Sequence, residues 1–413
     1  GKQNRFARGC GFFGPSRQFA GVSSPSRFAL ALTQPGEPNH PIADVFMNQQ
    51  PPPQSETSKA QDSKDPRVAR REKLRQIEAR GLDPFGVRFD DRTMIGRCHQ
   101  LSSEIRWTRE DGTDVPLPDF DDPDLDYRQW KADHGPGTET GPNVRVAGRI
   151  MLARGQGKLI FLTLRDWTGD IQIFIGKKQV GDDDIELAKL FDLGDLVGAE
   201  GRLGRTNTGE LTVFAESLFF HAKMLEPPPD KHAGLTNPDL RQRMRYADLA
   251  FNDGVLQTFL DRTEIVRSIR RTLDNEGYCE VEGPTLHMIA GGAAARPFAT
   301  HHNTLDMPLT MRIALELHLK RLMVGGMERV YELGRVYRNE GISPKHNPEF
   351  TMLECYQAYG DYNTMMDLTE RLITDSIEAI GGGLIRQYDG KTIDFTPPFQ
   401  RATYAALFQQ HTG

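Results

Sequence analysis

Between residues 143 and 224, short segments alternate hydrophobic and polar residues with the period of two that is typical of half-buried β-strands. The alternation predicts five strands, at residues 144–152, 158–165, 171–175, 196–204 and 211–221. A short run with helical spacing, at residues 185–191, separates the third strand from the fourth. The pattern therefore predicts a small β-barrel with one helix.

This order of strands and helix is that of the OB-fold. OB-folds bind single-stranded nucleic acids by stacking bases on aromatic side chains and by contacting base edges with polar groups. For Phe161, in the second predicted strand, the pattern alone favours a place in the barrel core.

Residues 66–81 have helical spacing, with Pro66 at the start and Gly81 at the end. One face of this predicted helix is basic. Two interpretations stay open, a solvated helix that packs by its few apolar residues and a helix that contacts nucleic-acid phosphates.

A second amphipathic helix is predicted from Val255, because apolar residues up to Leu273 fall on one helical face. Gly277 ends that helix, and residues 278–282 predict a strand that stops at Pro284. Towards the end of the sequence, residues 362–380 predict a further helix and Asp389-Gly390 predicts a two-residue hairpin turn.

These elements divide the 413 residues into four parts. Residues 1–65 predict a disordered leader; residues 1–46 have the composition of a transit peptide or precede a true start at Met47, and we favour the second interpretation. Residues 66–142 hold the basic helix and a segment without clear periodicity. Residues 143–226 form the barrel, and residues 227–413, after a triple proline, form the last part.

Composition excludes several classes of protein. A net charge of −6 argues against a general polyanion binder, so any nucleic-acid contact requires local patches. The four cysteines form no CxxC pair, which predicts neither a zinc site nor a disulfide framework and fits the cytoplasm. No apolar run approaches the length of a membrane span. A Walker phosphate-binding loop is absent, so ATP would have to bind by another scheme.

Residues 329–360 predict a strand, a polar loop and a second strand with many charged side chains. The sequence from Arg338 to Ser343, followed by residues 346–352 and Glu354, closely resembles motif 2 of class II aminoacyl-tRNA synthetases in its lysyl form. The helix and strand from Val255 to Pro284 resemble motif 1, which forms the dimer in that family. The resemblance covers residues 65–413 and implies an α+β fold: an N-terminal five-stranded OB-fold β-barrel followed by a partial class II antiparallel sheet with flanking helices.

The resemblance implies a lysine–tRNA ligase, which activates lysine with ATP and transfers it to tRNA(Lys). Arg338 would be the catalytic cation, since adenylate formation joins two anions. The residues that would bind ATP are Arg338, Glu340, Lys345, His346, Asn347 and Phe350. Those that would bind lysine are Gly292, Glu316, Glu354 and Tyr356. Leu315 stands where the family commonly has proline, and this departure is expected to loosen the turn that positions Glu316.

By the same resemblance the barrel would bind the anticodon through Arg154, Phe161, Gln172 and Glu216. The Gly-rich segment 381–386 only superficially resembles motif 3, so the second ATP-binding arginine and the acidic residues that hold Mg²⁺ are expected beyond residue 413. We therefore expect no metal ligands in this sequence, and an inactive, truncated enzyme. Two alternatives stay open, a non-catalytic tRNA-binding protein that uses the barrel and a ligase that lysylates a protein.

Overall fold

The computed structural model describes residues 65–413 except positions 87, 157–158, 230–233 and 344. The predicted leader, including the possible start at Met47, lies outside the described residues apart from Asp65. So does residue 158, the first position of the second predicted strand.

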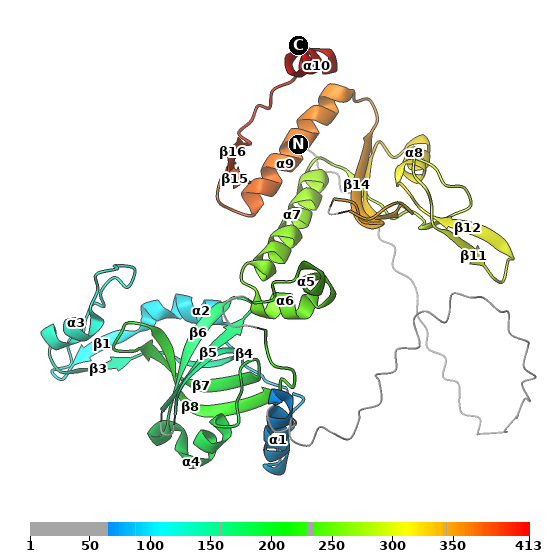
Figure 1. The fold of residues 1–413 in the computed structure, drawn as a ribbon. Coiled ribbons are helices and arrows are strands. Elements are labelled where there is room, and N and C mark those ends of the chain that lie inside the picture. The colour runs from blue at the N-terminus through cyan, green and yellow to red at the C-terminus, as the bar shows by residue number, and fades with distance from the viewer. Residues whose placement is uncertain (1–64, 87, 157–158, 230–233, 344) are drawn as a thin grey trace, which may run out of the picture. The chain divides into compact units, whose positions relative to one another are not determined.

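Five strands form a closed barrel (Figure 1). They are β4 (Asn143–Gln156), β5 (Leu159–Asp166), β6 (Gly169–Gly176), β7 (Leu196–Arg205) and β8 (Leu211–Ala222). The order around the barrel is β4-β5-β6-β8-β7, and β6 and β8 are the one parallel pair among these strands. All five predicted strands and the OB-fold order are confirmed.

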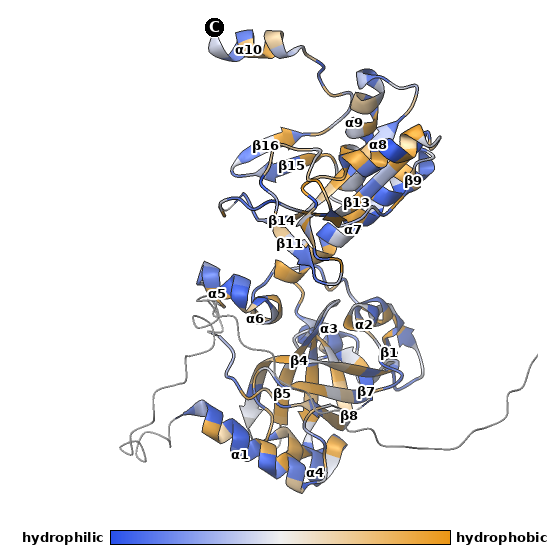
Figure 2. Ribbon diagram, turned by 90° about the vertical axis from the view of Figure 1, so that its right-hand side faces the viewer, coloured by the Kyte–Doolittle hydropathy of each residue, from blue (hydrophilic) through white to orange (hydrophobic). Residues whose placement is uncertain are grey.

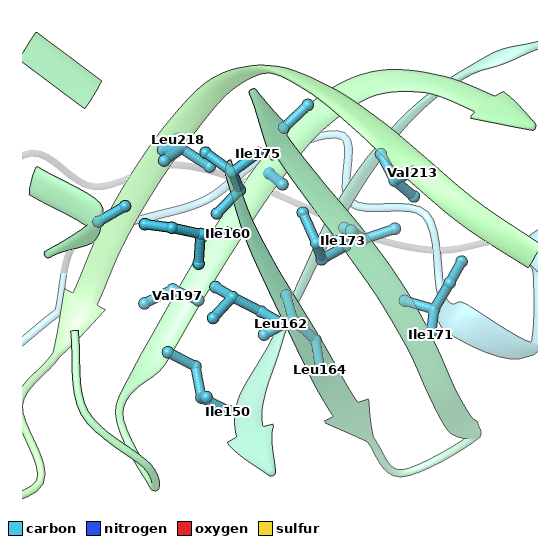
Figure 3. Packing of buried hydrophobic residues seen from close by; sticks show 14 of the residues in the cluster. Ile150, Ile160, Leu162, Leu164, Ile171, Ile173, Ile175, Val197, Val213 and Leu218 are labelled. Atoms are coloured by element: carbon cyan, nitrogen blue, oxygen red, sulfur yellow. The ribbon is translucent and has the colours of Figure 1, made fainter. Parts of the chain in front are cut away.

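Alternate residues of these strands fill the barrel interior (Figure 3). Leu162 and Leu164 on β5 and Ile173 on β6 are all almost completely buried. Because the side-chain period of a strand is two, the residues between them point away from the core. Phe161 and Phe174 are such residues, and both are only partly buried. The expectation that the pattern alone gives for Phe161, a place in the core, is therefore wrong.

The barrel helix differs from its prediction in position. Helix α4 spans Lys177–Ala188 and begins directly after β6, with a break at Gly181, which has φ +84°. Polar residues dominate its first half, so the apolar spacing that predicted a helix at 185–191 marked only its buried end. Leu190 and Phe191 pack on the barrel core after the helix has ended.

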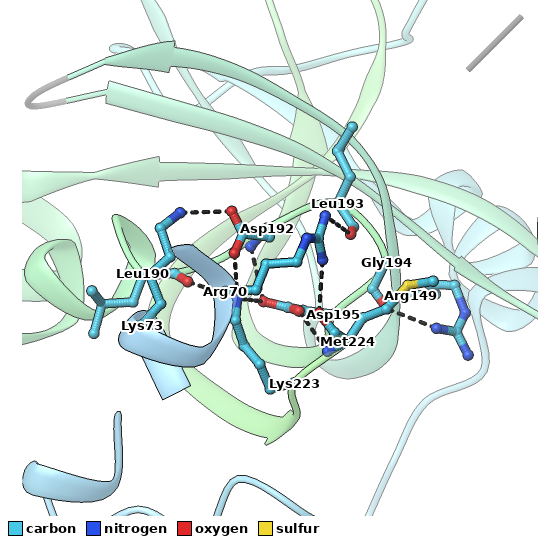
Figure 4. Close-up of polar contacts among 10 residues, drawn as sticks. All are labelled: Arg70, Lys73, Arg149, Leu190, Asp192, Leu193, Gly194, Asp195, Lys223 and Met224. Atoms are coloured by element: carbon cyan, nitrogen blue, oxygen red, sulfur yellow. Dashed lines mark hydrogen bonds and ion pairs between the residues drawn. The ribbon is translucent and has the colours of Figure 1, made fainter. Parts of the chain in front are cut away.

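Helix α1 (Pro66–Ala79) is attached to the barrel by its basic residues (Figure 4). Arg70 donates to the carbonyl oxygens of Met224 and Leu193 at 2.8 and 3.0 Å. Lys73 pairs with Asp192 at 2.6 Å. These cations bind the protein itself, which supports the interpretation of α1 as a packed helix over that of a phosphate-contacting one.

Lys223 lies at the centre of the same network and its side chain is fully buried. Its ammonium group contacts Asp192 and Asp195 at 2.6 and 2.7 Å and donates to the carbonyl oxygen of Leu190 at 3.0 Å. Breaking a buried ion pair by removing one partner is strongly destabilising, because the other charge stays buried without a partner.

We therefore expect Lys223→Met to lower the free energy of unfolding of the barrel by about 3–5 kcal/mol. Urea unfolding followed by tryptophan fluorescence measures this, since the three tryptophans of the sequence are Trp107, Trp130 and Trp167. Lys177→Met is the matched control, because Lys177 pairs with Asp182 at an exposed site. Equal effects of the two substitutions would contradict the prediction.

The segment without periodicity folds into a small extension of the barrel domain. It contains the 3-10 helix Ser102–Glu104, strands β1 (Arg106–Arg109), β2 (Asp114–Val115) and β3 (Gly137–Thr140), and helix α3 (Tyr127–Asp133). The strands form a sheet in the order β2-β1-β3. We call residues 102–140 the barrel extension. Helix α2 (Ile95–Leu101) precedes it.

The last part of the chain contains two three-stranded sheets. One has the order β14-β13-β9, built from β14 (Glu349–Gln357), β13 (Arg329–Tyr337) and β9 (Cys279–Glu280). The other has the order β10-β12-β11, built from β10 (Leu286–His287), β12 (Met307–Met311) and β11 (Ala299–His302). All these pairs are antiparallel except β9 with β13. The predicted motif 1 strand at residues 278–282 is thus shorter than expected.

The same part of the chain contains the following helices. They are α5 (Pro238–Arg243), α6 (Arg245–Phe251), α7 (Val255–Asn275), α8 (Glu316–Val324), α9 (Tyr362–Ala379) and α10 (Tyr404–Thr412). Leu273 of α7, Tyr331 of β13 and Leu368 of α9 share one hydrophobic cluster. The predicted Asp389-Gly390 turn joins β15 (Ile385–Tyr388) to β16 (Lys391–Asp394).

Hydrophobic and polar residues are distributed unevenly over these elements. Figure 2 shows hydrophobic residues concentrated on the barrel strands and polar residues covering α5. Among the helices of the described residues, none is both long and apolar enough to cross a lipid bilayer.

Candidate functional site

The hairpin β13–β14 positions the predicted catalytic arginine. Arg338 follows β13 directly, and its backbone N–H donates to the carbonyl oxygen of Pro348 at 2.8 Å. Its guanidinium carbon lies 5.1 Å from the centre of the Phe350 ring, and its Nε donates weakly to Ile313 at 3.4 Å. Both side chains are half-buried. An aromatic face beside a permanently charged planar cation can hold a base and an anionic group together.

Glu354 and Tyr356 lie on β14, two residues apart and so on the same face of the sheet. The Tyr356 hydroxyl donates to Glu354 Oε2 at 3.0 Å. Burial and the adjacent carboxylate raise the pKa of Tyr356. The phenol therefore stays protonated at neutral pH and remains a hydrogen-bond donor to Glu354.

The start of α8 contacts the same carboxylate. The backbone N–H of Leu315 donates to Glu354 Oε1 at 3.0 Å, and the Leu315 side chain is buried. A proline here could not make this bond because it has no N–H. The expected loosening of the turn is therefore not what the structure shows: a hydrogen bond to Glu354 holds it.

Gly292 approaches this turn closely. Its φ is +87°, and a Cβ at this position would lie 3.0 Å from the Cβ atoms of Ala314 and Glu316. Only glycine fits both the conformation and the space. Glu316 begins α8 and pairs with Lys320 at 2.6 Å, with its side chain 31% exposed. Gly292, Glu316 and Glu354 are thus brought together around α8 and β14.

The loop between the two strands is open to solvent. Glu340, Lys345, His346 and Asn347 are all exposed. His346 Nδ1 lies 2.8 Å from Ser343 Oγ, and the Asn347 side chain accepts from the backbone N–H of Glu349 at 3.2 Å. In the described part of this loop, no ion pair joins Glu340 to Arg338, and none joins Glu340 to Lys345. The structure thus groups Arg338 with Phe350 but does not bring the predicted loop residues onto them.

Sequence analysis missed a buried ion pair beside this hairpin, between Arg312 and Glu332 at 2.5 Å. Glu332 also accepts from the backbone N–H of Gly283 at 3.0 Å, and Arg312 donates to the carbonyl oxygen of Arg335 at 2.7 Å. Gly334 leaves room for it, since a Cβ there would lie 2.4 Å from the guanidinium. The pair joins the end of the motif 1 segment to β13.

The barrel carries a separate cavity of about 610 Å³. Three aromatic rings line it side by side, in the order Phe161, Phe174 and Phe214. The ring centres of the first two are 5.3 Å apart, and those of the last two are 5.4 Å apart. Gln172, on β6, is buried and accepts from Thr212 at 3.0 Å while its amide donates to Glu210 at 2.5 Å. Arg154 lies 4.0 Å from the same Glu210 carboxylate.

Of the four predicted anticodon residues, the cavity therefore brings together Arg154, Phe161 and Gln172. Glu216 is exposed beside an irregularity in the β7–β8 pairing and does not line the cavity. Sequence reasoning missed the following lining residues: Lys131, Glu139, Phe174, Arg202, Arg205, Glu210 and Phe214. The alternation of β6 and β8 could have identified Phe174 and Phe214, which face away from the core like Phe161.

Metal ligands do not gather in the part of the chain that the structure describes. No group of three or more His, Cys, Asp or Glu side chains there could hold an ion. The adjacent His301 and His302, on β11, are both exposed, and His301 pairs with Asp306 at 3.0 Å.

Comparison with known families assigns both parts of the chain. Residues 237–413 match the family described as tRNA synthetases class II (D, K and N). Residues 144–219 match an OB-fold nucleic acid binding domain. These two ranges coincide with the parts that hold the two candidate sites.

Individual relatives agree with this assignment. The chain is 48% identical over 353 residues to the lysine–tRNA ligase of Enterococcus faecalis, covering 86% of this chain and 66% of that protein. It is 44% identical over 354 residues to a lysine–tRNA ligase of Staphylococcus aureus, with the same coverage. The chain thus spans just under two thirds of the length of these relatives. It belongs to the class II tRNA synthetases of the D, K and N group and carries an OB-fold nucleic acid binding domain ahead of its synthetase domain.

Proposed function

We propose that this chain is part of a lysine–tRNA ligase that works in the cytoplasm. The observation that carries the proposal is the arrangement around Glu354, where a half-buried carboxylate is held by Tyr356 and by the start of α8, on the same hairpin as Arg338. A cationic side chain in a pocket needs an anionic partner. Glu354 supplies that partner for the lysine ammonium group.

In the proposed first step, the lysine carboxylate oxygen attacks the α-phosphorus of ATP, and the bond to the pyrophosphate group breaks. The carboxylate is already a nucleophile, so no general base is needed. Arg338 would lie between the two anions and stabilise the charge that develops on the phosphoryl oxygens. Phe350 would stack on adenine and fix the orientation of the nucleotide. In the second step, a terminal ribose hydroxyl of tRNA attacks the acyl carbon and AMP leaves.

The barrel cavity would hold the anticodon of tRNA(Lys). Phe161, Phe174 and Phe214 offer aromatic faces for bases, and Gln172 offers an amide for a base edge. Four cationic residues line the cavity against two carboxylates, which gives a local positive patch on a chain whose net charge is −6.

Phe161→Ala is expected to weaken tRNA(Lys) binding by about 1–3 kcal/mol, the range for loss of one base–aromatic stacking contact. Filter binding or fluorescence anisotropy at fixed salt measures the change. Phe120→Ala is a suitable comparison, because Phe120 packs under Arg205 and does not line the cavity. Unchanged affinity for Phe161→Ala would exclude the stacking role.

We further propose that the protein is a homodimer through residues Val255 to Pro284. The support for this proposal is the resemblance of the segment to motif 1, the dimer-forming element of the family.

Lysine-dependent ATP–pyrophosphate exchange tests the proposed activity, measured with this chain and with the product of its complete reading frame. Exchange that requires lysine supports the ligase. tRNA binding without exchange in either form would favour the alternative, a non-catalytic tRNA-binding protein that uses the barrel.

A further inference from the structure

The barrel extension, residues 102–140, has a small core of its own. The rings of Tyr127 and Trp130 stack with centres 5.5 Å apart, and Trp107 meets Trp130 edge-on at 6.3 Å. Tyr127 is almost completely buried. This aromatic core fixes helix α3 over the sheet β2-β1-β3, so the side chains on α3 have defined positions.

The extension is attached to the barrel at a specific point. Glu139, on β3, accepts from the backbone N–H of Arg205 at 2.6 Å through one oxygen and from the Tyr127 hydroxyl at 2.8 Å through the other. Gly204 makes room for this contact, because a Cβ there would lie 2.4 Å from the Glu139 carboxylate. The Glu139 side chain is only 7% exposed, so its charge is used within the protein.

This attachment brings Lys131 of α3 into the wall of the barrel cavity, together with Phe161 and Phe214. The Lys131 ammonium lies 4.3 Å from the centre of the Tyr127 ring and 3.6 Å from Glu139. Its side chain is 18% exposed, and Glu139, at 3.6 Å, is the carboxylate with which it pairs. Burial lowers the pKa of this group. An ammonium can donate three hydrogen bonds, so an anionic acceptor in the cavity would satisfy it.

Arg202 is a second cation in the wall of the same cavity. The Arg202 guanidinium lies over the Phe214 ring at 4.9 Å, and its Nη1 is buried without a hydrogen-bond partner in the part of the chain that the structure describes. Aromatic rings interleaved with cations match a single strand of RNA, in which bases alternate with phosphates. Lys131 and Arg202 share the single carboxylate of Glu139, each at 3.6 Å, so the three groups together keep a net positive charge that a small apolar ligand would not neutralise.

We propose that the barrel extension is a second wall of the RNA site, in which Lys131 binds a backbone phosphate next to the base stacked on Phe161. The inference rests on the proposed binding of tRNA by the barrel. It assigns to residues 102–140 a role in affinity for the RNA backbone.

The test is the salt dependence of tRNA(Lys) binding, because each phosphate contact adds about 0.7 to the slope of log K against log salt for a single strand. Lys131→Gln should reduce the slope by about that amount and weaken binding by about fivefold to tenfold at low salt. Lys131→Arg should keep the slope. Lys178→Gln, at an exposed position on α4, is the matched control and should behave like the unaltered protein.

A second measurement uses the unaltered protein, in case Lys131→Gln disturbs the extension. Bound tRNA should protect Lys131, but not Lys178, from acetylation by an amine-reactive reagent. An unchanged slope for Lys131→Gln, or no protection of Lys131, would overturn the inference while a loss on Phe161→Ala leaves the proposed function standing. Failure of the unaltered protein to bind tRNA would overturn both.

Discussion

In the product of the complete reading frame, replacing Arg338 with alanine is expected to reduce lysine-dependent ATP–pyrophosphate exchange by about 10²–10³-fold, the range for loss of one preorganised donor to a developing oxyanion. Two features of the structure lead to this expectation. The backbone of Arg338 is fixed by its bond to Pro348, and its guanidinium lies beside Phe350. If the proposed function is right, loss of the side chain removes a cation that would lie between an adenine stacked on Phe350 and the carboxylate of a lysine bound at Glu354.

The controls separate charge from geometry. Arg338→Lys keeps the charge but loses the planar fork, so it should restore only part of the rate. Arg335→Ala removes an arginine three positions earlier that pairs with Glu349 at an exposed site, and it should leave exchange near the original rate. tRNA binding should stay intact in all three variants, since the barrel is unchanged. Normal exchange by Arg338→Ala would exclude Arg338 as the catalytic cation.

The barrel was predictable because its strands are long and half-buried, so that hydrophobic and polar residues must alternate along each strand. The same reasoning failed for residues 102–140. The strands there have two to four residues, too few for a period to emerge, and the core that holds them consists of aromatic residues on β1 and α3. The fold of this segment, which no periodicity predicts, brings Lys131 and Glu139 into the wall of the cavity.

The candidate active site was predictable as far as it is local in sequence. The spacing within one hairpin places Arg338, Phe350, Glu354 and Tyr356, and the register of β13 with β14 confirms that hairpin. Contacts between distant segments could not be predicted. The bond from Leu315 to Glu354 joins residues 39 positions apart, and the Arg312–Glu332 pair joins residues 20 apart. Neither hydrophobic periodicity nor a sequence motif relates such residues to each other. Their contact depends on the path of the chain in three dimensions.

In the product of the complete reading frame, Glu354→Gln is expected to raise the lysine concentration needed for half-maximal exchange by more than about 10²-fold, with little change for ATP. The side chain keeps its shape but loses its charge, so the lysine ammonium would be buried without a counter-ion, which costs about 3–5 kcal/mol. Tyr356→Phe removes one hydrogen bond to Glu354 and should cost only about 1 kcal/mol. The two effects should therefore differ by more than tenfold.

A comparison on the same strand makes the result specific. Glu349→Gln alters an exposed carboxylate whose partner is Arg335 at 3.6 Å, and it should leave the response to lysine unchanged. If Glu354→Gln also raised the ATP requirement by a similar factor, the cause would be a disturbed sheet, because Glu354 also holds the start of α8 through Leu315. A selective effect on lysine requires that the carboxylate meets the ammonium group itself, which is what its position between Tyr356 and the Leu315 N–H predicts.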